Sequence, residues 1–153
     1  MNASEQKVLA DVQAFGWHVV LIPEDEAGPG FAFTIGLFQS YRHAEIIMFG
    51  LSHDVMHRVL NLIGSAVKEG RRFKAGDHSA DFLDRYECAF VDLPSSAYED
   101  FLGYARWFYK GNEFPAIQCV WPDSSGRFPW QQGAAEVVKL KQPIPGAGEG
   151  FHA

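Results

Sequence analysis

The chain has 153 residues, which suits one domain with one hydrophobic core. Hydrophobic residues make up 47% of it and aromatic residues 14%, so enough apolar surface can be buried to offset the entropy of folding, and a disordered chain is excluded. The balance of 13 Lys and Arg against 19 Asp and Glu gives a formal charge of -6, which would repel a phosphate backbone. Nucleic acid is therefore not an expected partner.

The first half of the sequence predicts a helix followed by three strands. An apolar stripe runs through residues 3–15, and Gly16 is placed to end the helix. The strands are expected over residues 17–22, 31–37 and 45–49, and residues 38–44 are expected to be irregular.

The second half predicts two helices and two strands. Val55, Val59, Ile63 and Val67 recur at steps of four, so residues 53–69 form the longest helix. A strand is expected over residues 86–93 and a last one over residues 116–121. Between them, Ser96 and Glu99 have the spacing of a capping box, which opens a helix that Gly111 ends.

Strands are not separated one by one by helices, so a doubly wound parallel sheet is not expected. The order of elements predicts an α+β fold, with a single mixed or antiparallel sheet, possibly split-barrel-like, and about three helices packed on it. Residues 1–141 are expected to form one globular domain. Residues 142–153 are rich in Pro and Gly and are expected to be a loosely ordered tail.

Two segments resemble a known family. The first runs from Phe33 to Leu37 and continues from Ala44 to Leu51; the second is Trp121-Pro122-Asp123 followed by residues 126–130. In this order they are similar to the bacterial domain of unknown function 4262, over roughly residues 7–130. Ala44 stands where that family more often has proline. The resemblance implies one intact bacterial domain and carries no reaction or catalytic residue with it.

The strand at residues 31–37 has one bulky face and one small face, because its side chains alternate. Thr34 carries the only hydroxyl of the small face, beside Ala32 and Gly36. Such a face leaves room for a ligand, or it lets a helix pack closely against the strand. Both interpretations stay open.

The segment from Trp121 to Trp130 places two indoles on either side of a polar turn. One hypothesis is an aromatic wall with Asp123 and Arg127 as polar contacts, Arg127 being suited to an anionic group. The alternative is a loop that its aromatic residues fold over the core, with Asp123 capping its own turn.

Histidine and cysteine give weaker signals. His18 follows Trp17 at the start of an apolar strand, where it is a candidate general base or ligand contact, or a structural residue bonded to a carbonyl. His53 and His57 have metal-ligand spacing, but no third ligand is identified, so no metal is predicted. Cys88 and Cys119 lie in strands without electropositive neighbours and are expected to be buried and inert.

No nucleophile elbow or phosphate-binding loop is present in the sequence, and no cofactor is predicted. No apolar run approaches the roughly 20 residues of a membrane span, and the first residues lack the pattern of a signal peptide. A cytoplasmic protein without a membrane partner is therefore expected; its oligomeric state is left open.

Three classes of function remain, and the first is favoured. It is a non-catalytic binding or regulatory domain that recognises a small molecule or a protein partner. The second is a small hydrolase or transferase that uses His18 and Asp123, and the third is a flavin- or nucleotide-binding split barrel. For the site, we expect one aromatic-lined cavity with Arg127 at its rim and the following residues in its walls: Trp17, His18, Thr34, Trp121, Asp123 and Trp130.

Overall fold

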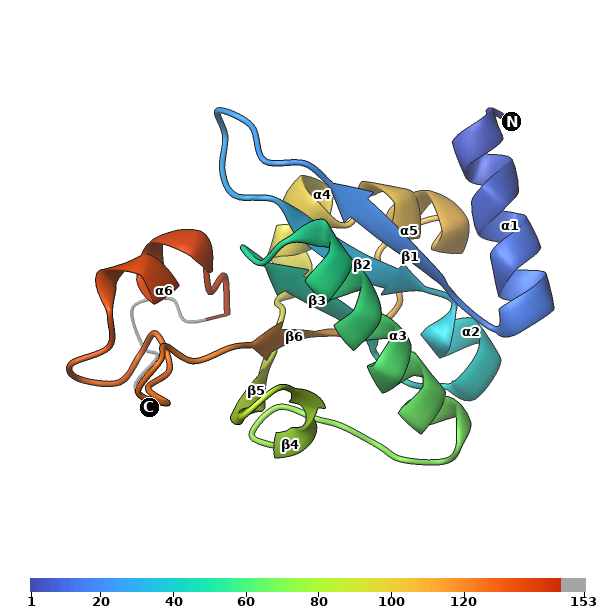
Figure 1. Ribbon diagram of the computed structural model, residues 1–153. Coiled ribbons are helices and arrows are strands. Elements are labelled where there is room, and N and C mark those ends of the chain that lie inside the picture. Colours follow the sequence, from blue (N-terminus) through green and yellow to red (C-terminus); the bar gives the residue numbers. More distant parts are fainter. Residues whose placement is uncertain (147–153) are drawn as a thin grey trace.

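One six-stranded sheet forms the centre of the computed structural model, which describes residues 1–146 (Figure 1). Its strand order is β1-β2-β3-β6-β5-β4. Only β3 and β6 are parallel, and all other neighbours are antiparallel. The strands are β1 (His18–Ile22), β2 (Phe31–Ile35), β3 (Glu45–Phe49), β4 (His78–Leu83), β5 (Tyr86–Asp92) and β6 (Ala116–Val120).

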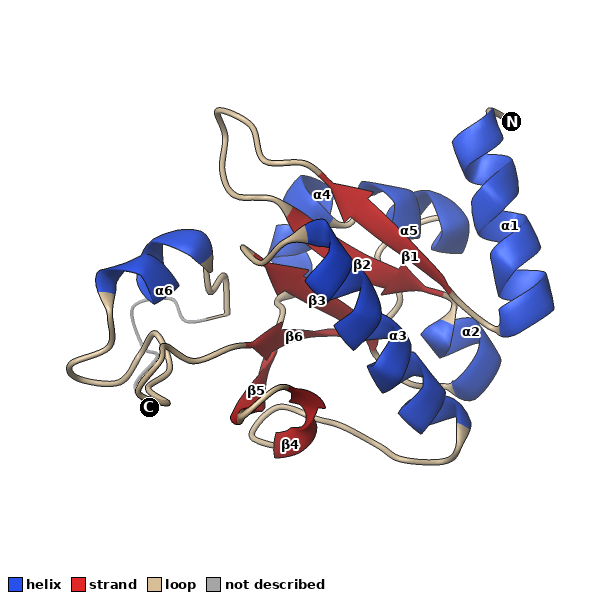
Figure 2. Ribbon diagram, in the orientation of Figure 1, coloured by secondary structure: helices blue, strands red, loops and turns tan. Residues whose placement is uncertain are grey.

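The sheet is open, with β1 and β4 as its edges (Figure 2). This confirms the predicted α+β class and single mixed sheet. The split-barrel variant of that prediction is wrong, because the two edge strands do not pair. The flavin or nucleotide hypothesis was placed on that variant and drew also on the aromatic wall, so the open sheet removes one of its two grounds.

The described residues form six α-helices and one short 3₁₀-helix, more than the three helices predicted. Two of the additional helices are short, and the predicted helix after Pro94 is divided at Leu102, whose backbone (φ -115°, ψ 40°) is not helical. The helices are α1 (Ala3–Phe15), α2 (Leu37–Tyr41), α3 (His53–Lys68), η1 (Ser95–Ala97), α4 (Tyr98–Phe101), α5 (Gly103–Tyr109) and α6 (Glu136–Lys141).

Helix α3 covers one face of the sheet (Figure 1). Ser52 caps it, its hydroxyl accepting a hydrogen bond from the backbone N–H of Val55. Its apolar stripe, which includes Val59 and Ile63, packs on alternate side chains of the strands. Val59 and Ile63 are fully buried, so the layer between α3 and the sheet supplies much of the hydrophobic stabilisation of the fold.

Helices α1, α4 and α5 contribute to the core on the opposite face. The strand side chains on this face, among them Phe33, are buried against residues of these helices. They include Val8 and Val12 of α1, Ala105 of α5, and Leu102, which immediately precedes α5. The sheet is thus buried on both faces, which explains why its central strands have few polar residues.

The strand β4 was not predicted, because its sequence, His78-Ser79-Ala80-Asp81, lacks the alternation of a half-buried strand. Only Ser79 and Phe82 are buried in it, and its pairing with β5 is irregular between Ser79 and Leu83. The pairing to β5 is what makes this segment a strand.

The buried carboxylate of Glu45 joins β3, β2 and the start of α2. It accepts hydrogen bonds from the hydroxyls of Thr34 and Tyr109 and from the backbone N–H groups of Gly36, Leu37 and Phe38. Residues 38–44 were predicted to be irregular; instead α2 forms there, because this carboxylate satisfies the amides that open the helix.

The C-terminal segment is described as far as Gly146. Gln142 is 1% exposed; its side chain accepts a hydrogen bond from Trp121 N and donates one to Trp121 O. Gln118 donates to the carbonyl of Pro143. The first two residues of the predicted tail are therefore packed on the domain, and residues 147–153 lie outside the described residues.

Candidate functional site

The residues predicted to line one cavity lie at opposite ends of the sheet. The strands β1, β3 and β6 run in the same direction, as their pairings require. His18 lies where β1 begins, whereas Asp123 follows the end of β6, and two strands separate β1 from β6. The structure therefore does not bring His18 and Asp123 together, and the single-cavity prediction is wrong in its geometry.

The turn after β6 satisfies its own polar groups. Asp123 accepts hydrogen bonds from the backbone N–H groups of Ser125 (2.9 Å), Arg127 (3.0 Å) and Ala135 (2.8 Å). Bonds of this kind, first the one from Arg127, lower the pKa of its carboxyl group. Both carboxylate oxygens are engaged, so Asp123 caps the turn and is not available as a partner for His18.

The tryptophans of this segment are anchored in the fold as well. Trp121 donates its indole N–H to the carbonyl of Phe49 at 2.7 Å, and Trp130 stacks on the buried Phe128 with ring centroids 5.2 Å apart. The side chain of Arg127 is exposed. The arrangement agrees with a loop folded over the core by its aromatic residues.

Thr34 is also part of the fold. It is fully buried, donates to Glu45 at 2.8 Å and accepts from the backbone N–H of Ile46 at 2.9 Å. The small face of β2 therefore serves close packing and a buried hydrogen-bond cluster. That cluster also joins the two parts of the first segment that carries the family resemblance, residues 33–37 and 44–51.

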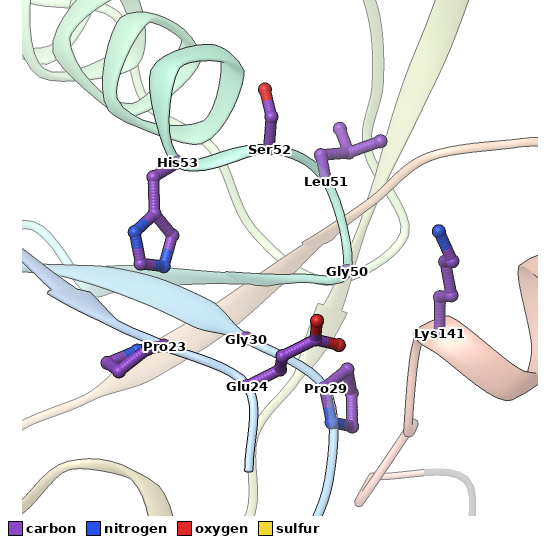
Figure 3. Close-up of a pocket in the computed structure, with 9 residues that line it drawn as sticks. All are labelled: Pro23, Glu24, Pro29, Gly30, Gly50, Leu51, Ser52, His53 and Lys141. Carbon is purple, nitrogen blue, oxygen red and sulfur yellow. The ribbon is translucent and has the colours of Figure 1, made fainter.

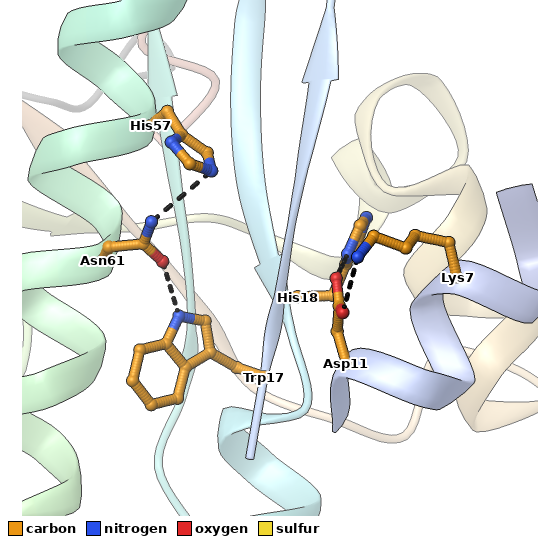
Figure 4. Close-up of polar contacts among 6 residues, drawn as sticks. All are labelled: Lys7, Asp11, Trp17, His18, His57 and Asn61. Carbon is orange, nitrogen blue, oxygen red and sulfur yellow. Dashed lines mark hydrogen bonds and ion pairs between the residues drawn. The ribbon is translucent and has the colours of Figure 1, made fainter. Parts of the chain in front are cut away.

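A different set of polar residues surrounds the start of β1. On one side, Asp11 of α1 bonds to His18 Nδ1 at 2.7 Å and accepts from Lys7 at 3.0 Å (Figure 4). The His18 and Asp11 side chains are 18% and 16% exposed. Although burial raises the pKa of Asp11, the hydrogen bonds from His18 and Lys7 outweigh it and lower the pKa below 3.8.

On the other side of β1, Trp17 points toward α3 (Figure 4). Its indole N–H donates to Asn61 Oδ1 at 3.0 Å, and the Asn61 amide lies 3.4 Å from His57 Nε2. Gly64, in the middle of α3, makes room for the indole, because a Cβ atom there would lie within 2.9 Å of three of its ring atoms. These contacts fix the orientation of Asn61 beside the strand.

Both sets of residues line a groove of about 560 Å³ between α1, β1 and α3. We call this the β1 groove. Lys68 at the end of α3 also lines it. A second cavity of about 510 Å³ shares Lys7, His18 and Val19 with it and continues along the whole of β1 to Ile22. The two cavities together follow the edge of the sheet.

Another pocket lies at the far end of the sheet, where the backbones of Gly30 and Gly50 meet (Figure 3). Glu24 and Lys141 supply opposite charges to its lining. His53 also lines it, but its Nε2 lies 2.9 Å from the carbonyl of Ile22, so this imidazole ties α3 to β1. The pocket has fewer hydrogen-bonded side chains than the β1 groove.

His53 and His57 take different partners, the Ile22 carbonyl and Asn61. Within residues 1–146, no group of three His, Cys, Asp or Glu side chains is placed to hold a metal ion. Cys88 and Cys119 are both fully buried.

Sequence reasoning missed Asp11 and Asn61. Asp11 is one of several polar residues of α1, and the turn at Gly16 brings β1 back along the helix so that His18 meets it. The one available signal was Gly64, since a glycine inside a long helix indicates close approach by another group.

The fold and the groove together define a single α+β domain with an open mixed sheet and a polar groove beside one edge strand. Residues 11–135 match the family model described as "Domain of unknown function (DUF4262)", and the chain belongs to this family. Neither the curated proteins nor the solved structures gave a match. In the described part of the chain, no helix has both the length and the apolar character needed to span a bilayer.

Proposed function

We propose that the chain is a non-catalytic recognition domain of the bacterial cytoplasm that binds an anionic ligand in the β1 groove. The observation that carries this proposal is the pair of hydrogen-bonded side-chain sets on either side of β1. They hold the imidazole of His18 and the amide of Asn61 in fixed places beside open space. Partly exposed and oriented donors of this kind are the usual means of fixing a polar ligand.

The charges of the groove favour an anion. Lys7 and Lys68 are the two cationic side chains among its lining residues, and Asp11 is the one carboxylate. Asp11 is already engaged by Lys7 and His18, so its charge is partly neutralised. The same ion pair offsets the charge of Lys7, so the lining keeps a net excess of one cationic side chain, Lys68, on a chain whose formal charge is -6, and such a local reversal of charge attracts anions.

The test uses the dicarboxylate glutarate as probe and titration calorimetry as readout. We expect saturable binding to the wild-type chain. Lys68→Glu should weaken it about 10-fold, which corresponds to about 1.4 kcal/mol. The matched control is Lys139→Glu, the same charge reversal on α6 at the other end of the sheet, which should leave the affinity unchanged. Equal loss in both variants, or no binding to the wild type, would contradict the proposal.

A second candidate function is general-base catalysis, and one observation favours it. Asp11 holds His18 Nδ1 at 2.7 Å, which is how a carboxylate orients a catalytic imidazole, and this gives His18 a partner that Asp123 cannot be. Hydrolysis of p-nitrophenyl acetate is the readout. Equal loss of rate in His18→Gln and Asp11→Asn, beyond the effect of a surface control such as Lys139→Glu, would support it over binding alone.

A further inference from the structure

We propose that the edge of β1 accepts an extended acidic peptide of a partner protein as a seventh strand of the sheet. This inference rests on the proposed function, since it specifies the ligand of the same groove. It follows from the hydrogen-bond register of β1, from a comparison of the two sheet edges and from the charge along the groove.

The register shows which backbone groups of β1 are directed outward. Gly50 donates its N–H to the carbonyl of Gly30, so the backbone of Gly30 is directed toward β3. By alternation, Phe31, Phe33 and Ile35 bond to β1, where they pair with Ile22, Val20 and His18. The N–H and C=O groups of the remaining two strand residues, Val19 and Leu21, therefore point away from the sheet.

The two edges of the sheet differ in their protection. β4 has an irregular pairing near its middle, and its Asp81 forms an ion pair with Arg71 at 3.0 Å. Such irregularities and charges keep an edge from pairing with another strand. β1 has neither: four consecutive aliphatic residues, 19–22, follow His18, and Leu21 is 38% exposed. An edge of this kind is suited to pairing.

The surroundings of β1 favour one extended chain as the occupant. Two cavities run along the strand, so space for a further chain exists over its five residues, about 17 Å of extended backbone. Lys7 and Lys68 line these cavities, and they favour acidic side chains in the added strand. A second copy of this chain would instead bring the same lysines toward each other.

The added strand would use main-chain bonds for affinity and side-chain contacts for selection. Its backbone would pair with Val19 and Leu21. Its side chains would alternate between the two sides of β1, toward His18 and Asp11 on one and toward Trp17 and Asn61 on the other (Figure 4).

The experiment uses a synthetic six-residue peptide of alternating glutamate and valine, with amide hydrogen exchange as the readout. Without peptide, the amides of Val19 and Leu21 should exchange much faster than that of Val20, which is bonded to β2. Saturating peptide should slow both outward amides at least 10-fold. A peptide of alternating lysine and valine should not.

The matched pair of variants is Leu21→Pro and Leu21→Ala. Proline removes only an outward N–H, which edge strands tolerate, and so should abolish peptide binding while the sheet stays intact. Alanine keeps the N–H and should bind within about threefold of wild type, since the loss is one partly exposed side chain. If Leu21→Pro does not fold, the exchange rates of the wild type and of Leu21→Ala still decide the question.

Three outcomes overturn the inference. Glutarate binding without peptide protection of Val19 and Leu21 leaves the proposed function standing and rejects strand addition. Absence of both glutarate and peptide binding rejects both. A stable dimer of the free chain, shown by light scattering and abolished by Leu21→Pro, assigns the edge to a second copy instead.

Discussion

The two segments that carry Trp17 and Trp121 both combine an indole with a nearby polar residue, but their polar groups are used differently. After β6, both carboxylate oxygens of Asp123 accept hydrogen bonds from backbone N–H groups of its own loop. Beside β1, His18 and Asn61 are bonded on one side and lie in the wall of an open groove on the other. The comparison teaches that residue types alone identify a segment that combines aromatic and polar side chains. The hydrogen-bond partners of the polar side chains then decide whether the segment stabilises the fold or can bind a ligand.

The largest expected effect concerns Glu45, the most fully satisfied polar group of the scaffold. Glu45→Ala leaves five donors without their acceptor in a buried cluster, and should lower the free energy of unfolding by at least about 3 kcal/mol. Urea denaturation measures it. Glu45→Gln keeps one carbonyl oxygen as an acceptor, so it should lower the free energy of unfolding by less than Glu45→Ala does. A Glu45→Ala variant with nearly unchanged free energy of unfolding would contradict the assignment of this hydrogen-bond cluster to the structural scaffold.

Trp130→Ala tests the scaffold side of the comparison directly. Trp130 is half-buried and stacked on Phe128, so its truncation should cost about 2 kcal/mol, less than the 3–5 kcal/mol of a fully buried tryptophan. Glutarate affinity should be unchanged in the folded variant. Loss of binding with stability retained would instead make the β6 turn the site.

Gly64→Ala tests how the wall of the β1 groove is packed. The new methyl group collides with the Trp17 indole and should cost about 1–2 kcal/mol, even though alanine is favoured over glycine in helices by about 1 kcal/mol. Thermal unfolding gives the stability, and the Asn61 side-chain amide signals should shift in NMR spectra. A stabilised variant with unchanged Asn61 signals would mean that Trp17 does not pack against α3.

The smallest expected effect is the pH dependence of the contribution that Asp11 makes to folding stability. Because its pKa is lowered in the folded state, its contribution to stability is present above pH 3.8 and is lost as the pH falls through the lower folded value. The stability difference between wild type and Asp11→Asn should therefore shrink below about pH 4 in denaturant titrations. A difference that grows on acidification would show that Asp11 is not held as the charged partner of His18 and Lys7.

The sequence was sufficient for the sheet's central strands and for α1 and α3, because buried strands are continuous apolar runs and α3 has a clear stripe with a serine cap. It was not sufficient for α2 and β4. α2 depends on the carboxylate of Glu45, and β4 depends on pairing with β5. Both causes are tertiary contacts that leave no local pattern.

The candidate site was predicted in part. Trp17 and His18 do line the groove, but their partners Asp11 and Asn61 come from helices whose approach to β1 no spacing reveals. Asp123 and Trp130 were grouped with them because similar residue types suggested a shared purpose. Strand direction, which the sequence does not state, separates the two sets.

One NMR titration tests the central claim most directly, because each tryptophan contributes one indole N–H signal and the chain has 4 Trp. Glutarate and the acidic peptide are added in turn to the wild-type chain. If the β1 groove is the site, the Trp17 signal shifts in a saturable way while those of Trp121 and Trp130 stay in place. A saturable shift of Trp130 with Trp17 unmoved would contradict the account and assign recognition to the turn after β6.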